Sequence, residues 1–346
     1  MSVIEAPTPT DVVRRARRRP LNRHRLVVGG LSVLLFLLFV ARVLLGDYTI
    51  TIPDFFRIVT GTEIPGASFI LLESKLPRAL LGVLVGVAFG VGGAIFQTIL
   101  RNPLASPDVI GISVGASAAA VAVLILVDVT DNRWLSLAAI LGALGTAAIV
   151  RLVSGGVAGY RLVLIGVGMA AALNSVIQYL FTRADIFDAQ LALRWLTGSL
   201  HQADWPTIRV LVVLLIVLTP IVAWLARSLR ITELGEDAAA GLGVTTRRTD
   251  ALLLVGVVLV AVGVAASGPI AFVSFLAGPI SRALNAGRTT LLGAGLVGAA
   301  IVVAADYAAE YLILDINFPV GVVTGALGAP FLLWLLASGR TGRRSA

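Results

Sequence analysis

The chain has no cysteine and only two histidines among its 346 residues. Disulfides, thiol redox chemistry and thiolate metal sites are therefore excluded. His24 and His201 fall in loops or at the ends of apolar runs, and no nucleophile stands at a plausible spacing from a base. The phosphate-binding pattern Gly-x-x-x-x-Gly-Lys-Ser/Thr is also missing. We expect a protein that is not an enzyme, that binds no metal or cofactor itself, and that leaves any use of ATP to a partner.

Charged residues are scarce as well. They make up 13% of the chain, against 58% hydrophobic residues, and the mean hydropathy is +0.97. This composition leaves too few polar side chains to cover a soluble protein of this length. The net charge of +8 would suit nucleic acid only if the basic residues formed a patch, but they flank apolar runs. We expect an integral membrane protein with no nucleic-acid partner.

Apolar runs long enough to cross a bilayer, about 17 to 25 residues, recur along the chain. We expect ten spans, near 26–45, 78–100, 109–127, 134–152, 161–181, 207–226, 250–267, 269–284, 290–306 and 318–337. The division between the seventh and eighth rests on Ser267-Gly268-Pro269, which could also mark a hairpin or a broken helix. The sequence thus predicts an all-α integral membrane protein with about ten transmembrane helices in a single domain, residues 26–337.

Arginine is distributed unevenly between the two sides of these spans. Seven arginines precede the first span and three follow the last. With ten spans, 19 of the 27 basic residues fall on the side that holds both termini. Because basic residues favour the cytoplasmic side, we expect basic cytoplasmic tails at 1–25 and 338–346. The location that follows is the cytoplasmic (inner) membrane, which the chain crosses several times.

Ionisable side chains are missing from the centres of the expected spans. Every acidic residue falls at the end of a span or in a loop, whereas ion-coupled carriers usually need an acid or a lysine at mid-depth. The notable polar residues inside spans are neutral: Gln97, Asn174 and Gln178, the last two one turn apart on one helix face. They either bond neighbouring helices or line a polar conduit. The pattern disfavours an ion-coupled secondary carrier, which stays an alternative.

A short polar insert lies between the sixth and seventh spans. Residues 232–243 read Thr-Glu-Leu-Gly-Glu-Asp-Ala-Ala-Ala-Gly-Leu-Gly. Three alanines preceded by acids predict a short helix closed by Gly241 or Gly243. Its small, nearly apolar surface suits insertion into a groove on another protein, although a connector on the membrane surface is the simpler reading. A scaffold or sensor that grips a cytoplasmic partner without moving a solute is a further alternative.

Six motifs occur in an order that resembles the permease subunits of type II ABC importers, the family that takes up ferric siderophores, haem and vitamin B12. They are Leu76-Pro-Arg78; Gln97 followed by Arg101-Asn-Pro-Leu-Ala-Ser-Pro107; Gly111-Ile-Ser-Val-Gly-Ala-Ser117; Trp195-Leu-Thr-Gly198; Leu234-Gly-Glu236 with Leu242-Gly243; and Pro319-Val-Gly-Val-Val-Thr324 with Gly328-Ala-Pro330. Each motif is weak alone, but all six in the family's order are specific. The resemblance covers nearly the whole chain after about residue 30.

The resemblance assigns roles to particular residues. The insert matches the family's coupling helix, which sits in a cleft of the ATP-hydrolysing subunit, through Leu234, Gly235, Glu236, Asp237, Ala238, Ala239, Gly241, Leu242 and Gly243. Lys75 and Arg78 fall where the family has basic residues that pair with glutamates of a substrate-binding protein, although juxtamembrane cations also anchor by snorkelling. Structural motif positions are Asn102, Pro103, Pro107, Pro319, Gly321 and Pro330. Among them, Pro103 is expected to end one helix and Pro107 to start the next.

The resemblance also implies a machine with several subunits. Two ABC ATPase subunits would bind MgATP, an extracytoplasmic substrate-binding protein would deliver the cargo, and a second permease would complete a pathway that works by alternating access. The second, fifth and eighth spans of both permeases are expected to border that pathway, with Gln97, Asn174 and Gln178 as candidate lining residues. A ferric siderophore is the expected cargo, and haem or vitamin B12 are the alternatives.

Two departures from the family's pattern stand out. Relatives often show Val-Pro-His in the eighth span, where this chain has Ala277-Gly278-Pro279. Where relatives can carry a second docking arginine on the outer face, this chain has Glu310. A less basic outer face predicts a heterodimer in which a different but related permease supplies the missing cation.

Overall fold

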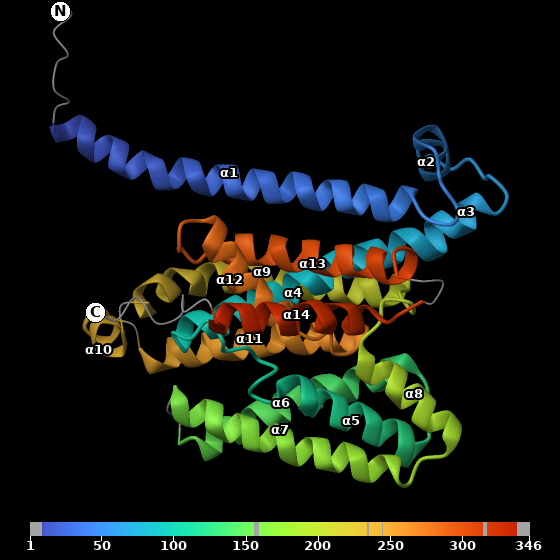
Figure 1. The fold of residues 1–346 in the computed structure, drawn as a ribbon. Helices are drawn as coiled ribbons and strands as arrows, with labels where there is room; N and C mark the ends of the chain where they lie inside the picture. Colours follow the sequence, from blue (N-terminus) through green and yellow to red (C-terminus); the bar gives the residue numbers. More distant parts are fainter. Residues whose placement is uncertain (1–8, 156–158, 234, 244, 314–316, 338–346) are drawn as a thin grey trace, which may run out of the picture.

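The computed structural model describes residues 9–155, 159–233, 235–243, 245–313 and 317–337, and these form helices joined by short connections with no strand (Figure 1). The expected all-α class is confirmed within the described residues. Leu234 and the basic tail at 338–346 lie outside them. So do the side chains of residues 9–20, Arg230, Glu236, Asp237, Leu335 and Leu336, although these positions belong to helices.

The helices have the following bounds: α1 Pro9–Leu44, α2 Ile52–Val59, α3 Ala67–Phe69, the π-helical turn η1 Ile70–Lys75, α4 Leu76–Ile99, α5 Ile112–Val127, α6 Asn132–Val153, α7 Tyr160–Phe181, α8 Ile186–Thr197, α9 Trp205–Thr232, α10 Glu236–Gly241, α11 Thr246–Ser267, α12 Val273–Leu284, α13 Leu291–Tyr311 and α14 Val320–Ala337. Each of the ten expected spans corresponds to one of these helices. The small helices α2, α3 and α8 and the turn η1 were not predicted.

The apolar helices differ in length. Among the described residues, seven helices are long and apolar enough to cross a membrane, while α5, α12 and the apolar part of α14 are shorter, at 10 to 17 residues. A multi-pass membrane protein is therefore supported. The total of ten crossings stays a prediction, because it depends on these three shorter helices.

Helix α4 occupies the centre of the bundle, where it packs against α13, α11, α12 and α9 (Figure 1). Of the most apolar 18-residue stretch in the segment 67–99, 72% is buried. Glycine makes this packing possible: a Cβ on Gly86 would lie 2.5 Å from the Cα of Ala299, and one on Gly93 would lie 1.9 Å from the carbonyl oxygen of Ser274. Small residues let membrane helices approach through their backbones, so the glycine-rich sequence of α4 places it in the interior.

Helices α5, α6 and α7 pack on one another and form a second group, on the opposite side of the central helices from α1 (Figure 1). Helix α5 begins at Ile112, and Gly111 just before it packs against the backbone of Ala170, in the middle of α7. The connection 100–111 therefore reaches into the bundle. The expectation that Pro107 starts a helix is wrong, because residues 103–111 form turns that precede α5.

The two ends of the bundle carry different structures. The start of α1 and helix α10 lie at one end, while α2, α3 and α8 lie at the other (Figure 1). Helix α1 begins at Pro9, so most of the expected basic tail at 1–25 continues the first span as a helix. The arginine-rich end, which we expect to be cytoplasmic from the positive-inside rule, is the end that carries α10.

Candidate functional site

Helix α10 lies at the expected cytoplasmic end and links two long helices of the bundle. Helix α9 runs six residues beyond its expected span, through Thr232, and α11 begins at Thr246. Gly235 precedes α10 with a φ of +109°, and Gly243 follows it with a φ of +82°. Glycine adopts such left-handed conformations without steric cost. The sequence expectation of a short helix closed by a glycine is confirmed, with narrower bounds than 232–243.

The described part of α10 presents small and apolar groups. Ala239 is buried, Leu242 is 61% exposed, and Ala238 and Gly241 are also exposed. The helix is closed by hydrogen bonds from the Leu242 amide to the Ala238 carbonyl and from the Gly243 amide to the Ala240 carbonyl, at 3.1 and 3.0 Å. An exposed apolar tip on a rigid turn fits a groove better than it fits water.

The connection between α4 and α5 lies beside α10. A Cβ on Gly235 would be 3.4 Å from a guanidinium nitrogen of Arg101. Asn102 accepts a hydrogen bond from the Leu104 amide through its side-chain oxygen, at 2.9 Å, and Pro103 sits inside this turn. Asn102 and Pro103 thus form the turn that follows α4, as the sequence indicated, and this turn places Arg101 next to the residue that precedes α10.

A buried acid lies deeper in the same connection. The Asp108 carboxylate accepts hydrogen bonds from the hydroxyls of Ser113, in the first turn of α5, and Ser274, in the first turn of α12; the second bond is 2.7 Å long. Burial raises the pKa of Asp108. The sequence placed this acid in a cytoplasmic loop, and the structure places it between the starts of two short helices, where it joins them.

Gln97 is 1% exposed and lies between α4 and α12. Its amide nitrogen donates to the Phe275 carbonyl at 3.0 Å, and its amide oxygen accepts from Arg282 at 2.9 Å. Interhelical hydrogen bonding, the first role considered for Gln97, is what the structure shows. Its role as a lining residue stays a prediction, and in this conformation the side chain has almost no free surface.

Asn174 and Gln178 share an exposed face of α7, as their spacing predicted. The Asn174 amide donates to the Ala170 carbonyl of its own helix at 3.0 Å. Only 17% of the most apolar 18-residue stretch of α7 is buried, so this polar face has no neighbour within the described chain. Polar side chains facing lipid are unfavourable, so the role of this face as a pathway lining or a contact with another chain stays a prediction.

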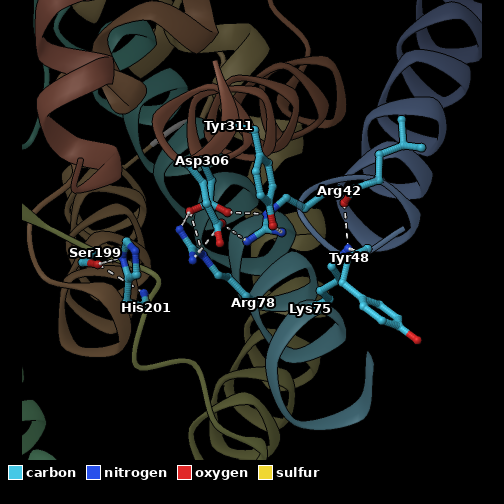
Figure 2. A network of polar contacts seen from close by, with 10 residues as sticks. Arg42, Tyr48, Lys75, Arg78, Ser199, His201, Asp306 and Tyr311 are labelled. Carbon is cyan, nitrogen blue, oxygen red and sulfur yellow. Dashed lines mark hydrogen bonds and ion pairs between the residues drawn. The ribbon is translucent and has the colours of Figure 1, made fainter. Parts of the chain in front are cut away.

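At the opposite end, four charged side chains form a closed network, three of which, Arg42, Arg78 and Asp306, are labelled in Figure 2. Arg42 of α1 binds Asp306 at 2.7 Å and Glu310 at 2.6 Å, both on α13. Arg78 of α4 binds the same two carboxylates, each at 2.8 Å. The charges of the two cations and the two anions cancel, and such pairing is what allows charged side chains to be buried. The network ties together the ends of α1, α4 and α13 that we expect to be the outer ones.

Comparison with known proteins assigns this chain to a family. The profile of the FecCD transport family matches residues 34–338. The chain belongs to the FecCD transport family. Among its relatives are the ferric enterobactin transport system permease protein FepG of Escherichia coli, 36% identical over 84% of this chain and 89% of the relative, and the achromobactin transport system permease protein CbrC of Dickeya dadantii, 37% identical over 90% and 92%.

A haem system also has a relative in the family. The hemin transport system permease protein HmuU of Yersinia pestis is 34% identical over 92% of this chain and 97% of its own length. A solved structure described as an inward-facing conformation of a metal-chelate type ABC transporter superposes with a TM-score of 0.79 and 26% identity, covering 90% of this chain and 99% of that one. Sequence and fold therefore place this chain among FecCD permeases.

The two cations expected to dock a binding protein are buried in this FecCD chain. Arg78 is 6% exposed and held by both acids of the network, and Lys75 is 4% exposed. The Lys75 ammonium donates to the carbonyls of Leu45 and Tyr48 at 2.8 and 2.6 Å. Docking through either residue stays a prediction. Glu310, where the resemblance allowed a second docking arginine, is an internal partner of Arg42 and Arg78.

The remaining motif positions lie at the start of α14 or within it. Helix α14 starts directly after Pro319, and a Cβ on Gly321 would lie 2.0 Å from the Thr197 carbonyl oxygen at the end of α8. Pro330 lies inside α14. Sequence reasoning missed Arg42 and Asp306, because each stands at the end of an apolar run and nothing in the local pattern pairs them.

Proposed function

We propose that this chain is the membrane-spanning permease subunit of an ABC importer that moves a ferric siderophore across the cytoplasmic membrane. Helix α10 carries the proposal: a short, glycine-bounded helix with an exposed apolar tip, joined to the long helices α9 and α11. Each of two ATPase subunits that bind MgATP would receive one such helix in a groove. Their closure would tilt α9 and α11 and switch access to the pathway.

The pathway would lie between this chain and a second permease, at the polar face of α7. Asn174 and Gln178 are exposed there, and they would line the conduit or bond across the interface. Gln97 would reach the pathway only if α4 and α12 separate during the cycle. A neutral lining suits a bulky solute that must be released, because tight contacts would hold it.

A siderophore is favoured as cargo by the relatives. FepG and CbrC are named for transport of ferric enterobactin and achromobactin, and HmuU is named for hemin. Haem and vitamin B12 are therefore the second candidates. An extracytoplasmic binding protein would deliver the cargo at the end of the bundle that carries α2 and α8.

Radio-iron uptake into cells that lack this gene tests the proposal. The intact chain should restore uptake of one class of ferric siderophore, and Ala240→Arg, which places a bulky cation on an exposed position of α10, should reduce it at least about tenfold at equal membrane level. Ala283→Arg is the matched control, since Ala283 is exposed in the last turn of α12 at the same end of the bundle. It should transport like the parent.

Other results would redirect the proposal. Equal uptake with Ala240→Arg and Ala283→Arg would remove the coupling role of α10. No gene dependence with any ferric siderophore would leave haem and cobalamin, tested in the same cells. Uptake that survives ATP depletion but not loss of the ion gradient would indicate an ion-coupled secondary carrier, and ATPase binding without any uptake would indicate a scaffold or sensor.

The second permease is proposed to be a different but related chain. Because Arg78 and Lys75 are buried and Glu310 is acidic, this subunit does not present the cations that the resemblance assigned to docking. A sister chain would supply them. Recovery of a homogeneous permease together with its ATPase from native membranes would contradict the heterodimer while leaving the importer assignment intact.

A further inference from the structure

An apolar groove opens between α6 and α9, at the end of the bundle opposite α10. Both helices pack on α11, which forms the floor of the groove. Leu137 and Ile140 of α6 face Val210 and Leu214 of α9, with Ala265 and Ala266 of α11 beneath them. The groove has a volume of about 770 Å³, within the range of sites that hold small molecules. Because its walls are mainly apolar, the groove suits a hydrocarbon chain.

The depth of the groove matches one leaflet of a bilayer. Along α9 it extends from Asp204 to Leu214, which is about 15 Å at the rise of an α-helix. The hydrocarbon core of a bilayer is about 30 Å thick, so the groove covers about half of it. Trp134 stands 59% exposed in the first turn of α6, where an aromatic side chain fits the membrane–water interface. The expected occupant is therefore one lipid of the outer leaflet.

The mouth of the groove carries two acids and one base. Asp131 and Asp204 cap α6 and α9: each accepts a backbone amide through Oδ1, from Arg133 and Thr207 respectively, at 2.9 Å. Among the contacts of the described residues, neither carboxylate uses its second oxygen, and the Arg133 side chain makes no ion pair. All three side chains line the groove.

This charge pattern selects among lipid headgroups. An ammonium group can donate hydrogen bonds to the two carboxylates, while a phosphate can pair with the guanidinium. A quaternary amine such as choline cannot donate, and an anionic glycerol headgroup would meet two carboxylates with no cation of its own. The headgroup that best matches the charges at the mouth of the groove is therefore zwitterionic and carries a primary amine.

We propose that the groove between α6 and α9 binds an aminophospholipid of the outer leaflet, with an acyl chain against Val210 and Leu214, the ammonium at Asp131 and Asp204, and the phosphate at Arg133. The lipid would bridge α6 to α9 and α11, the two helices that carry α10. The site is separate from the cargo pathway and does not depend on which solute the protein moves.

Native mass spectrometry of the full-length protein tests this with phosphatidylethanolamine, phosphatidylcholine and phosphatidylglycerol of identical acyl chains. Phosphatidylethanolamine should bind about tenfold more tightly than the other two. The double variant Asp131→Asn/Asp204→Asn keeps both helix caps, because asparagine caps as well as aspartate. It should bring the three dissociation constants to within about twofold of one another.

A pair of variants on α9 tests the groove itself. Val210→Phe fills it and should weaken all three lipids about tenfold, while Val213→Phe, at a position equally exposed but outside the groove, should bind like the parent. Equal binding by these two variants would overturn the site. Tighter binding of phosphatidylglycerol, or an unchanged preference in the double Asp variant, would overturn the headgroup assignment.

Discussion

Replacing Arg42 by methionine should be among the most damaging single changes at the outer end of the bundle. The side chain is 1% exposed and donates to two carboxylates, Asp306 at 2.7 Å and Glu310 at 2.6 Å. Without it, Arg78 alone faces both acids, so the network carries a net negative charge away from water. Methionine retains most of the apolar volume, so the charge is the main change.

The magnitude follows from the cost of an unpaired buried charge. Breaking a buried ion pair by removing one partner destabilises a protein by about 3–5 kcal/mol. Neutralising one acid as well should restore much of the loss. In Arg42→Met/Glu310→Gln, Arg78 and Asp306 remain as a balanced pair, so we expect recovery of at least about 2 kcal/mol relative to the single variant.

Denaturation of the purified protein in mixed micelles, followed by tryptophan fluorescence, measures these differences. Arg57→Met is the control, because its pair with Asp54 is 3.9 Å long and its side chain is 68% exposed. Exposed pairs contribute about 0–1 kcal/mol. If Arg42→Met denatures like Arg57→Met, or if the double variant is no more stable than the single one, the network does not stabilise the outer end as argued.

Three further predictions use the same measurement. Gly93→Ala should lower the stability by about 1–3 kcal/mol or more, because its methyl group would overlap the backbone of α12. Gly145→Ala, with open space around it, should be neutral or stabilising by up to about 1 kcal/mol. Equal effects of the two substitutions would contradict the close packing of α4. Gln97→Leu should cost about 1–3 kcal/mol by leaving Arg282 without its acceptor, and an unchanged stability would refute that role. Burial raises the pKa of Asp108, so ionisation of this carboxyl group opposes folding. The gain in stability of Asp108→Asn over the parent should therefore grow as pH rises above about 3.9. Asp108→Leu, which offers the two serine hydroxyls no acceptor, should be less stable than Asp108→Asn at every pH.

Much of the fold could be read from the sequence because hydropathy and glycine spacing are local properties. Every expected span has a helix, and the insert at 232–243 contains a short helix, Glu236–Gly241, with Gly235 before it and Gly243 after it. The errors are local as well. The start of α5 was placed at Pro107, because a proline often opens a helix, but the chain first turns inward so that Gly111 can reach α7.

The candidate sites were less predictable than the helices. Lys75 and Arg78 were singled out as candidate docking residues, a role that stays a prediction, and their partners within the fold could not be read from the sequence. Lys75 binds backbone carbonyls 27 and 30 residues away, and backbone carbonyls leave no compositional signal. Gln97 and Asn174 look alike as polar residues within spans, yet one is buried between helices and the other is exposed.

By itself, the sequence determined that this protein lies in a membrane, which end of each span is basic, that a short helix lies between two long ones, and which family the chain belongs to. These properties depend on composition and on motifs within a few residues of each other. Only the tertiary structure decided which charges are neutralised: Arg42 and Asp306 are 264 residues apart, and Gln97 and Arg282 are 185 apart. The reason is physical. A buried charge is stable only if a partner group lies within about 3 Å of it. The arrangement of the whole bundle determines which group that is.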